Sequence, residues 1–187
     1  HSMDAAYMVD DKIGYIKINA FARTTTDEFV AGLAKLKAQG MKSLILDLQN
    51  NGGGYLGEAI KLSDQFLSKD KLIVYTEGRA YKKEEKLSTK KGDYEKGKLV
   101  ILINENTASA SEIVSGAIQD WDRGVILGRR SFGKGLVQRP IPLTDGSKVR
   151  ITTQRYYTPT GRSIQKSYEN GSKAYRKEKY ERFLNGE

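Results

Sequence analysis

Residues 43–54 read SLILDLQNNGGG, and this stretch decides the class of fold. Residues 43–48 form a short and nearly continuous apolar run, which is typical of a parallel strand buried on both faces. Three glycines follow at 52–54, and the apolar spacing of residues 60–67 then predicts a helix. A buried strand that leads through a glycine-rich loop into a helix is the building unit of an α/β protein.

The same alternation of strands and helices continues on both sides of this stretch. Apolar patterning predicts strands at 12–19, 72–75, 99–103 and 125–127, and helices at about 24–40 and 110–120. The charged segment 79–97 is interpreted as a hairpin or flap, a β-hairpin is expected at 136–157 around the turn 144–146, and the tail from 168 is partly helical. We therefore expect an α/β fold with a mainly parallel sheet plus a C-terminal β-hairpin.

The composition excludes several kinds of catalytic and metal-binding site. The chain has 187 residues, no Cys and a single His, so thiol nucleophiles, disulfides and Cys-ligated metals are excluded. That histidine is His1, and residues 1–3 resemble the remnant of an expression tag, which leaves 4–187 as the domain. A Ser-His-Asp triad is then also excluded. We expect no metal and no cofactor.

The net charge of +9 raises the possibility of a nucleic-acid partner. The basic stretches 79–98 and 162–187 both contain acidic residues as well, so a solvated surface is the better interpretation and no nucleic-acid partner is expected. No stretch approaches the roughly 20 apolar residues that a membrane helix requires.

Three loops follow predicted strands, and in parallel sheets functional sites lie beyond the carboxyl ends of the strands. The loop 49–55 offers glycine amides that could cradle an oxyanion, or it is a plain flexible turn. Ser109 in the second loop could be a nucleophile, but Ser109 and Glu112 also spell a capping box, S-x-x-E, which needs no catalysis. Taken alone, the second pattern favours the cap.

The third loop, residues 128–135, resembles the phosphate-binding pattern G-x-x-x-x-G-K-[ST]. Gly135 stands where Ser or Thr must hold Mg²⁺, and the two prolines in 136–142 favour a strand over the required helix. We therefore reject a nucleotide site. Lys134 between two glycines suits a lysine that is inserted into a site.

Together the loops supply a serine, a lysine and backbone donors, which is the set that a Ser–Lys hydrolase needs. A lysine base must lose its charge before it can accept a proton, so we expect the site to desolvate Lys134. Asp120 lies eleven residues after Ser109, about 16 Å along a straight helix. We interpret Asp120 as structural, either capping or bracing the loop that carries Lys134.

Three ordered motifs, at 47–54, 109–113 and 132–138, resemble those of the carboxyl-terminal processing (tail-specific) serine peptidases. Their residues are most similar to those of Bacteroides-like members. The stretch 155–165 fits the same family, and the resemblance extends from about residue 14 to 165. It implies a crotonase-like peptidase core.

By this resemblance, Ser109 is the nucleophile, Lys134 is the general base and Gln138 orients the lysine side chain. The backbone amides of Gly53 and Ala110 would form the oxyanion hole. Two departures concern the first loop: Gly52 and Gln49 stand where the family commonly has Pro and Arg.

The resemblance also implies an endopeptidase that cleaves unfolded or tagged proteins near their C-termini, in the periplasm or at the cell envelope after export. Family members often carry a PDZ domain, which is absent from this chain, and oligomers are possible. The alternative is a non-catalytic peptide-binding module of the same fold, in which Ser109 only caps a helix. Lys134 argues against it, since a binding module has no use for a desolvated amine.

Overall fold

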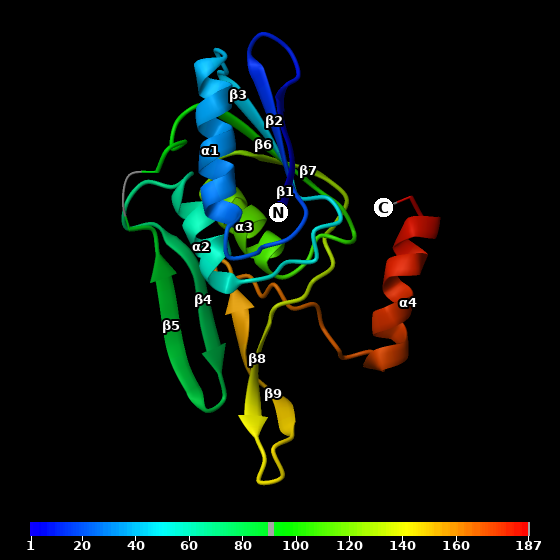
Figure 1. The fold of residues 1–187 in the computed structure, drawn as a ribbon. Helices are drawn as coiled ribbons and strands as arrows, with labels where there is room; N and C mark the ends of the chain where they lie inside the picture. Colours follow the sequence, from blue (N-terminus) through cyan, green and yellow to red (C-terminus); the bar gives the residue numbers. More distant parts are fainter. Residues whose placement is uncertain (90–91, 187) are drawn as a thin grey trace.

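The computed structural model describes residues 1–89 and 92–186. Figure 1 shows the elements, of which the strands are β1 (Met3–Met8), β2 (Ile13–Ile18), β3 (Ser43–Asp47), β4 (Leu72–Gly78), β5 (Tyr81–Leu87), β6 (Lys98–Ile103), β7 (Val125–Gly128), β8 (Leu136–Pro142) and β9 (Lys148–Tyr157). The helices are α1 (Thr25–Ala38), α2 (Leu56–Asp64), α3 (Ala110–Asp120) and α4 (Gly171–Leu184). The predicted elements are all present, and the expected fold class is confirmed.

The larger sheet has the order β1-β2-β3-β6-β7, and β2, β3, β6 and β7 run parallel. Helices α1, α2 and α3 lie together beside this sheet (Figure 1). Ile16, Leu46 and Ile101 are register neighbours on three adjacent strands, and each is 0% exposed. This row is the centre of the core, and it holds the carboxyl ends of β3 and β6 side by side.

The smaller sheet is antiparallel, with the order β5-β4-β9-β8. The segment 79–97, expected to be a hairpin or flap, supplies only the strand β5, which forms a hairpin with the preceding strand β4; positions 90 and 91 of that segment lie outside the described residues. The sequence did not predict that this hairpin pairs with β9, where the rings of Tyr75 and Tyr157 stack with centroids 4.9 Å apart. The two hairpins thereby become one sheet.

The first residues also belong to the fold. The amides of Ser2 and Met3, two residues assigned to the tag remnant, each donate a hydrogen bond of 2.9 Å to Glu28 Oε2 in α1. Residue 3 then begins β1, which pairs antiparallel with β2 and was not predicted.

None of the helices in the described part of the chain combines the length and apolar character that crossing a bilayer requires.

Candidate active site

Ser109 occupies a strained turn between β6 and α3. Its backbone angles are φ 58° and ψ −115°, a region that residues with side chains rarely adopt. A sharp strand-to-helix turn of this kind exposes a serine hydroxyl in nucleophile elbows. The side chain of Ser109 is half-buried, with the small residues Ala108 and Ala110 on either side.

Ser111 is the other serine that the motif offers, and it is 0% exposed. Its hydroxyl donates to the backbone carbonyl of Asn51 at 3.1 Å. Ser111 is therefore a structural tie between α3 and the glycine-rich loop, and of these two serines a substrate can reach only Ser109.

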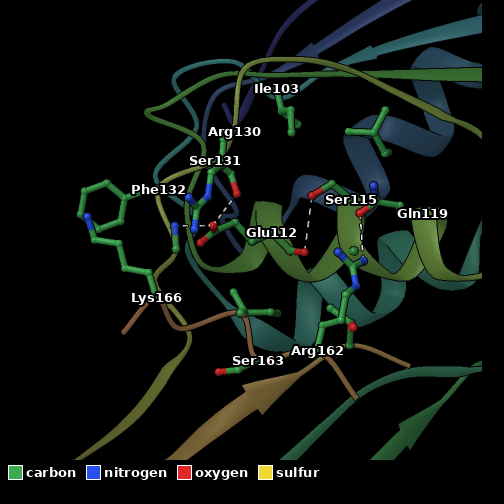
Figure 2. A pocket seen from close by; sticks show the side chains of 15 residues that line it. Ile103, Glu112, Ser115, Gln119, Arg130, Ser131, Phe132, Arg162, Ser163 and Lys166 are labelled. Atoms are coloured by element: carbon green, nitrogen blue, oxygen red, sulfur yellow. Dashed lines mark hydrogen bonds between the residues drawn. The ribbon is translucent and has the colours of Figure 1, made fainter. Parts of the chain in front are cut away.

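Glu112 connects the serine turn to the loop that carries Lys134. The predicted capping box of Ser109 and Glu112 is present. Glu112 Oε2 accepts hydrogen bonds from the amides of both Ser109, at 2.7 Å, and Lys134, at 2.8 Å. Its other oxygen accepts from the amide of Gly133 at 2.6 Å and from the hydroxyl of Ser131 at 2.7 Å (Figure 2). One buried carboxylate thus fixes two loops relative to one another.

We refer to residues 129–135 as the base loop. Its amides hold a carboxylate of the protein itself, in the place where a phosphate-binding loop would present them to a ligand. The amide of Phe132 also donates to the carbonyl of Thr107 at 2.9 Å. The base loop is therefore tied on both sides of Ser109 in the sequence, to Thr107 before it and to Glu112 after it.

The side chain of Lys134 does not show the desolvation that we expected. It is exposed, and in the described part of the chain its ammonium has no hydrogen bond or ion pair. Gln138 lies on β8 beside a bulge, opposite Thr152, and is also exposed. The structure brings the backbones of Ser109 and Lys134 together and leaves the lysine amine in solvent, because no acceptor from the described residues faces it.

The glycine-rich loop reaches the serine turn at Gly53. A Cβ atom on Gly53 would lie 2.9 Å from the backbone nitrogen of Ala110, so the two expected oxyanion donors are neighbours. The amide of Ala110 is the first in α3 and has no acceptor within the helix. The amide of Gly53 already donates to Asn51 Oδ1 at 2.9 Å.

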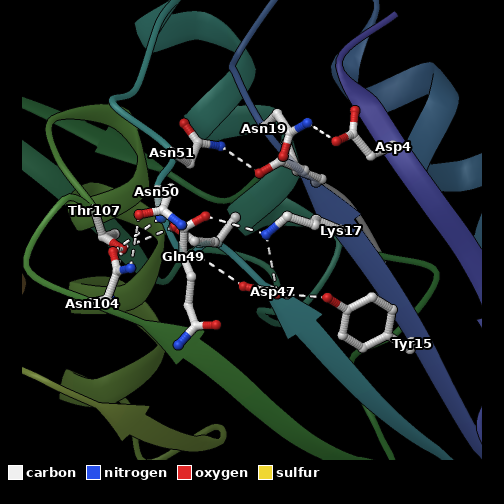
Figure 3. Close-up of polar contacts among 12 residues, drawn as sticks. Asp4, Tyr15, Lys17, Asn19, Asp47, Gln49, Asn50, Asn51, Asn104 and Thr107 are labelled. Carbon is white, nitrogen blue, oxygen red and sulfur yellow. Dashed lines mark hydrogen bonds and ion pairs between the residues drawn. The ribbon is translucent and has the colours of Figure 1, made fainter.

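Asn51 holds this loop in place, and it is 0% exposed. Its side-chain amide donates to the carbonyl of Ile18 at 2.8 Å (Figure 3). Its own carbonyl accepts from the amide of Ala108 at 2.9 Å. These contacts supply rigidity at a place where the family commonly has a proline. In the sequence, the only indication of this role was that Asn51 directly precedes the glycines.

A second polar cluster supports the start of the same loop (Figure 3). Asp47 Oδ2 accepts from the Tyr15 hydroxyl at 2.5 Å and pairs with Lys17 Nζ at 3.1 Å. Lys17 also donates to the carbonyl of Gln49 at 3.3 Å. Burial and the hydrogen bond to Asp47 raise the pKa of the Tyr15 hydroxyl, which therefore remains a donor.

Asp120 is structural, as expected, but it braces a different segment. It accepts from the amide and hydroxyl of Thr160, at 2.9 and 2.7 Å, and from Arg162. Burial alone would raise the pKa of Asp120, but hydrogen bonds to its carboxylate lower it. Asp120 thus holds the 158–162 turn. Its effect on the base loop is indirect, through the residues that follow this turn.

A model of peptidase family S41 matches residues 12–171. The chain belongs to peptidase family S41. A carboxy-terminal-processing protease of Bartonella bacilliformis is 43% identical over 164 residues, which cover 85% of this chain and 38% of that protein. A protein of Staphylococcus epidermidis described as a probable CtpA-like serine protease is 36% identical, over 88% of this chain and 34% of the relative.

The structural comparison agrees with the family. The solved structure of a photosystem II D1 C-terminal processing protease has a TM-score of 0.78 and 35% identity, with 82% of this S41 chain and 39% of that chain covered. The family and the α/β peptidase fold expected from the sequence motifs are thereby confirmed. This S41 chain spans little more than a third of the length of these relatives.

Proposed function

We propose that this chain is the hydrolytic core of a serine endopeptidase that cleaves proteins near their C-termini. Ser109 acts as the nucleophile and Lys134 as the general base. The observation that carries the proposal is the pair of hydrogen bonds to one oxygen of Glu112, from the amides of Ser109 and Lys134. It holds the backbones of the two residues next to one another, which supports a mechanism that needs a serine and a lysine at one site.

In the first half-reaction, the hydroxyl oxygen of Ser109 attacks the carbonyl carbon of the scissile peptide bond. Neutral Lys134 takes the serine proton as the new C–O bond forms. The amides of Ala110 and Gly53 donate to the developing oxyanion, which stabilises the tetrahedral intermediate. The lysine ammonium then gives its proton to the leaving amine, and the peptide bond breaks to give an acyl-enzyme.

In the second half-reaction, water attacks the acyl-enzyme while Lys134 takes a proton from it. Collapse of the second tetrahedral intermediate returns the proton to Ser109 and releases the new carboxyl terminus. The mechanism uses one residue as both base and acid, in the role that histidine has in a serine triad.

Two adjustments, one of a side chain and one of a backbone hydrogen bond, are part of this proposal. Lys134 has to turn from solvent toward Ser109, and Gln138 on the adjoining strand orients it there. A bound polypeptide covers the amine and supplies the desolvation that this structure lacks. The amide of Gly53 has to share its hydrogen bond to Asn51 with the oxyanion.

The partners of the whole protein are proposals from the family. We propose unfolded or tagged polypeptides as substrates, delivered by a PDZ domain outside this chain. An exported, periplasmic or envelope location and an oligomeric assembly also stay predictions.

Labelling with a fluorophosphonate, which reacts covalently with activated serines, tests the proposal. We expect one label per chain, located on Ser109 by mass spectrometry, and cleavage of an unfolded protein that stops once labelling is complete. Ser109→Ala should abolish both signals.

Ser111→Ala is the matched control. It should keep the label and the activity, and lose about 1 kcal/mol of unfolding free energy with its buried hydrogen bond. A label on Ser111, or cleavage by Ser109→Ala, would show that the nucleophile is wrongly assigned.

A further inference from the structure

The base loop has a second set of contacts, on the side away from Glu112. The amide of Lys166 donates to the carbonyl of Gly133 at 3.1 Å, and the amide of Gly135 donates to Gln165 Oε1 at 3.0 Å. A Cβ atom on Gly133 would lie only 2.9 Å from Cβ of Lys166. The segment 165–166 therefore lies directly against the glycines that flank Lys134.

Lys166 links this segment to α4. Its side chain is only 8% exposed, which is rare for a lysine and requires partners for its charge. Lys166 Nζ donates to the carbonyl of Tyr175 at 2.7 Å and pairs with Glu178 at 2.8 Å. The ammonium also lies over the ring of Tyr175, at 3.9 Å, and 5.8 Å from that of Phe132 in the base loop (Figure 2).

Glu178 forms ion pairs with cationic side chains from the base loop, from the segment 165–166 and from its own helix. Besides Lys166, its carboxylate pairs with Arg130 at 3.5 Å and with Arg182 of the same helix at 3.7 Å. Arg130 is itself part of the base loop, and Lys166 belongs to the segment that packs against this loop. The hydrogen bond from Lys166 is the main cause that lowers the pKa of Glu178, so the carboxylate is charged at neutral pH.

Packing alone does not hold the base loop on this side. A cavity of about 410 Å³ lies between α3, the base loop and the segment 158–166, and Arg130, Ser131 and Phe132 line it (Figure 2). A loop that borders a cavity lacks the van der Waals contacts that fix a buried segment. Its position then depends on polar ties: those to Glu112, the backbone ties to Thr107 and to the segment 165–166, and the ion pairs through which Glu178 holds Arg130 and Lys166.

We propose that Glu178 is a positioning residue for the general base: from α4 it holds the base loop through Arg130 and Lys166, so that Lys134 is presented to Ser109. The inference rests on the proposed function for its catalytic meaning. Its structural part, the restraint of the base loop by α4, stands independently and is measured separately.

Hydrogen–deuterium exchange of the 187-residue chain tests the restraint directly. In Glu178→Gln, the amides of Gly133 and Lys134 should exchange about tenfold faster than in the unaltered chain, because a charge-assisted tie is lost. Glu181→Gln on the same helix is the control: Glu181 pairs with Lys177, at 3.4 Å on the surface, and base-loop exchange should not change. Equal exchange in Glu178→Gln and the unaltered chain would overturn the inference.

Cleavage kinetics separate positioning from a merely structural role. Glu178→Gln should slow turnover about 10- to 100-fold and leave KM unchanged, since the substrate still binds to a misplaced base. Lys166→Met should behave alike, and Lys166→Arg, which keeps the charge, should restore most of the rate. A rise in KM alone, or equal loss in Lys166→Arg and Lys166→Met, would contradict positioning.

The two proposals fail in different ways. If the unaltered chain neither cleaves nor takes the fluorophosphonate on Ser109, the proposed function is wrong, and exchange still decides whether α4 restrains the base loop. If the chain is active and Glu178→Gln matches it in both measurements, only the role of Glu178 is wrong.

Discussion

A Cβ atom added to Gly53 would lie 2.7 Å from Cβ of Ser109, closer than two such carbons approach in proteins. It would also lie 2.8 Å from the carbonyl oxygen of Ala108. Gly53 has φ 97°, which already disfavours any side chain. The glycine-rich loop can reach Ser109 only because this position has no side chain.

Gly53→Ala should therefore displace the serine turn and the oxyanion donors together. We expect turnover to slow about 100-fold, the scale that a shift of about 1 Å in an active site causes. The melting temperature should fall as well, because backbone atoms have to move. Steady-state cleavage and thermal unfolding measure the two effects.

Gly52→Ala is the matched control, one residue away. A Cβ atom there would meet nothing within 4 Å, and Gly52 is not in the positive-φ region. This variant should retain most of its activity and be as stable as the unaltered chain, or more stable by up to about 1 kcal/mol. Similar losses in the two variants would contradict the specific role of Gly53.

Glu112→Gln should uncouple the nucleophile from the base. The amide keeps the size of the side chain but turns one acceptor oxygen into a donor, which then faces N–H or O–H donors. We expect a loss of about 2–3 kcal/mol in unfolding free energy, from charge-assisted hydrogen bonds. Turnover should also become slower, by roughly tenfold or more, because the two reacting residues lose their shared support. Urea unfolding and cleavage of an unfolded protein measure the two effects.

Glu85→Gln serves as the control for Glu112→Gln. Glu85 forms an exposed ion pair with Lys83 on β5, so its loss should change stability by less than about 1 kcal/mol and leave cleavage unaltered. Full activity in Glu112→Gln would show that the shared carboxylate does not align the site.

The pH dependence of cleavage distinguishes a lysine base from a histidine base. Activity should rise through the neutral range and into the alkaline range, because the base has to be uncharged. A histidine base would give a limb near its usual pKa of about 6.5. Rates measured across the acidic, neutral and alkaline ranges should be unaffected by His1→Ala. Full activity at about one pH unit below that histidine limb would argue against Lys134.

Stability in acid should depend on Glu28. The hydrogen bond from Thr24, together with the amides of Ser2 and Met3, lowers the pKa of Glu28 from 4.5 to about 2. Between these values the unfolded chain binds a proton that the folded chain does not, so stability is lost as the pH falls through this window. Urea unfolding at neutral pH and at pH values down into this window should show a shallower decline in Glu28→Gln.

The control for Glu28 is His1→Ala. His1 lies 3.9 Å from Glu28, but its side chain is 95% exposed, so the slope with pH should barely change. An unaltered slope in Glu28→Gln would show that its contacts with the first residues do not persist in solution.

Sequence patterns predicted the fold well wherever apolar periodicity was strong. The helix expected at 110–120 and the strand expected at 99–103 are α3 and β6. β1 was missed because residues 3–8 alternate weakly, and its place in the sheet depends on pairing with β2. The pairing of β4 with β9 was missed as well, since residues about 80 positions apart leave no local signal.

The candidate site shows the same division. Local motifs made Ser109 and Lys134 candidates, the family resemblance made Gly53 one, and the capping box pointed to Glu112 only as a helix-start residue. Its contacts with Ser131, Gly133 and Lys134 join segments about 20 residues apart, and no local spacing encodes them. The buried Asn51 was likewise visible in the sequence only as a polar residue before glycines.

The dependence of the base loop on later residues has a consequence during protein synthesis. Glu112 precedes the base loop in the chain, but the carbonyl of Gly133 and both backbone polar groups of Gly135 have their partners at residues 156, 165 and 166, which are synthesised later. A nascent chain that ends between these points lacks this second set of contacts with the base loop. On the proposed function, we therefore expect proteolytic competence only after residue 166 has been synthesised.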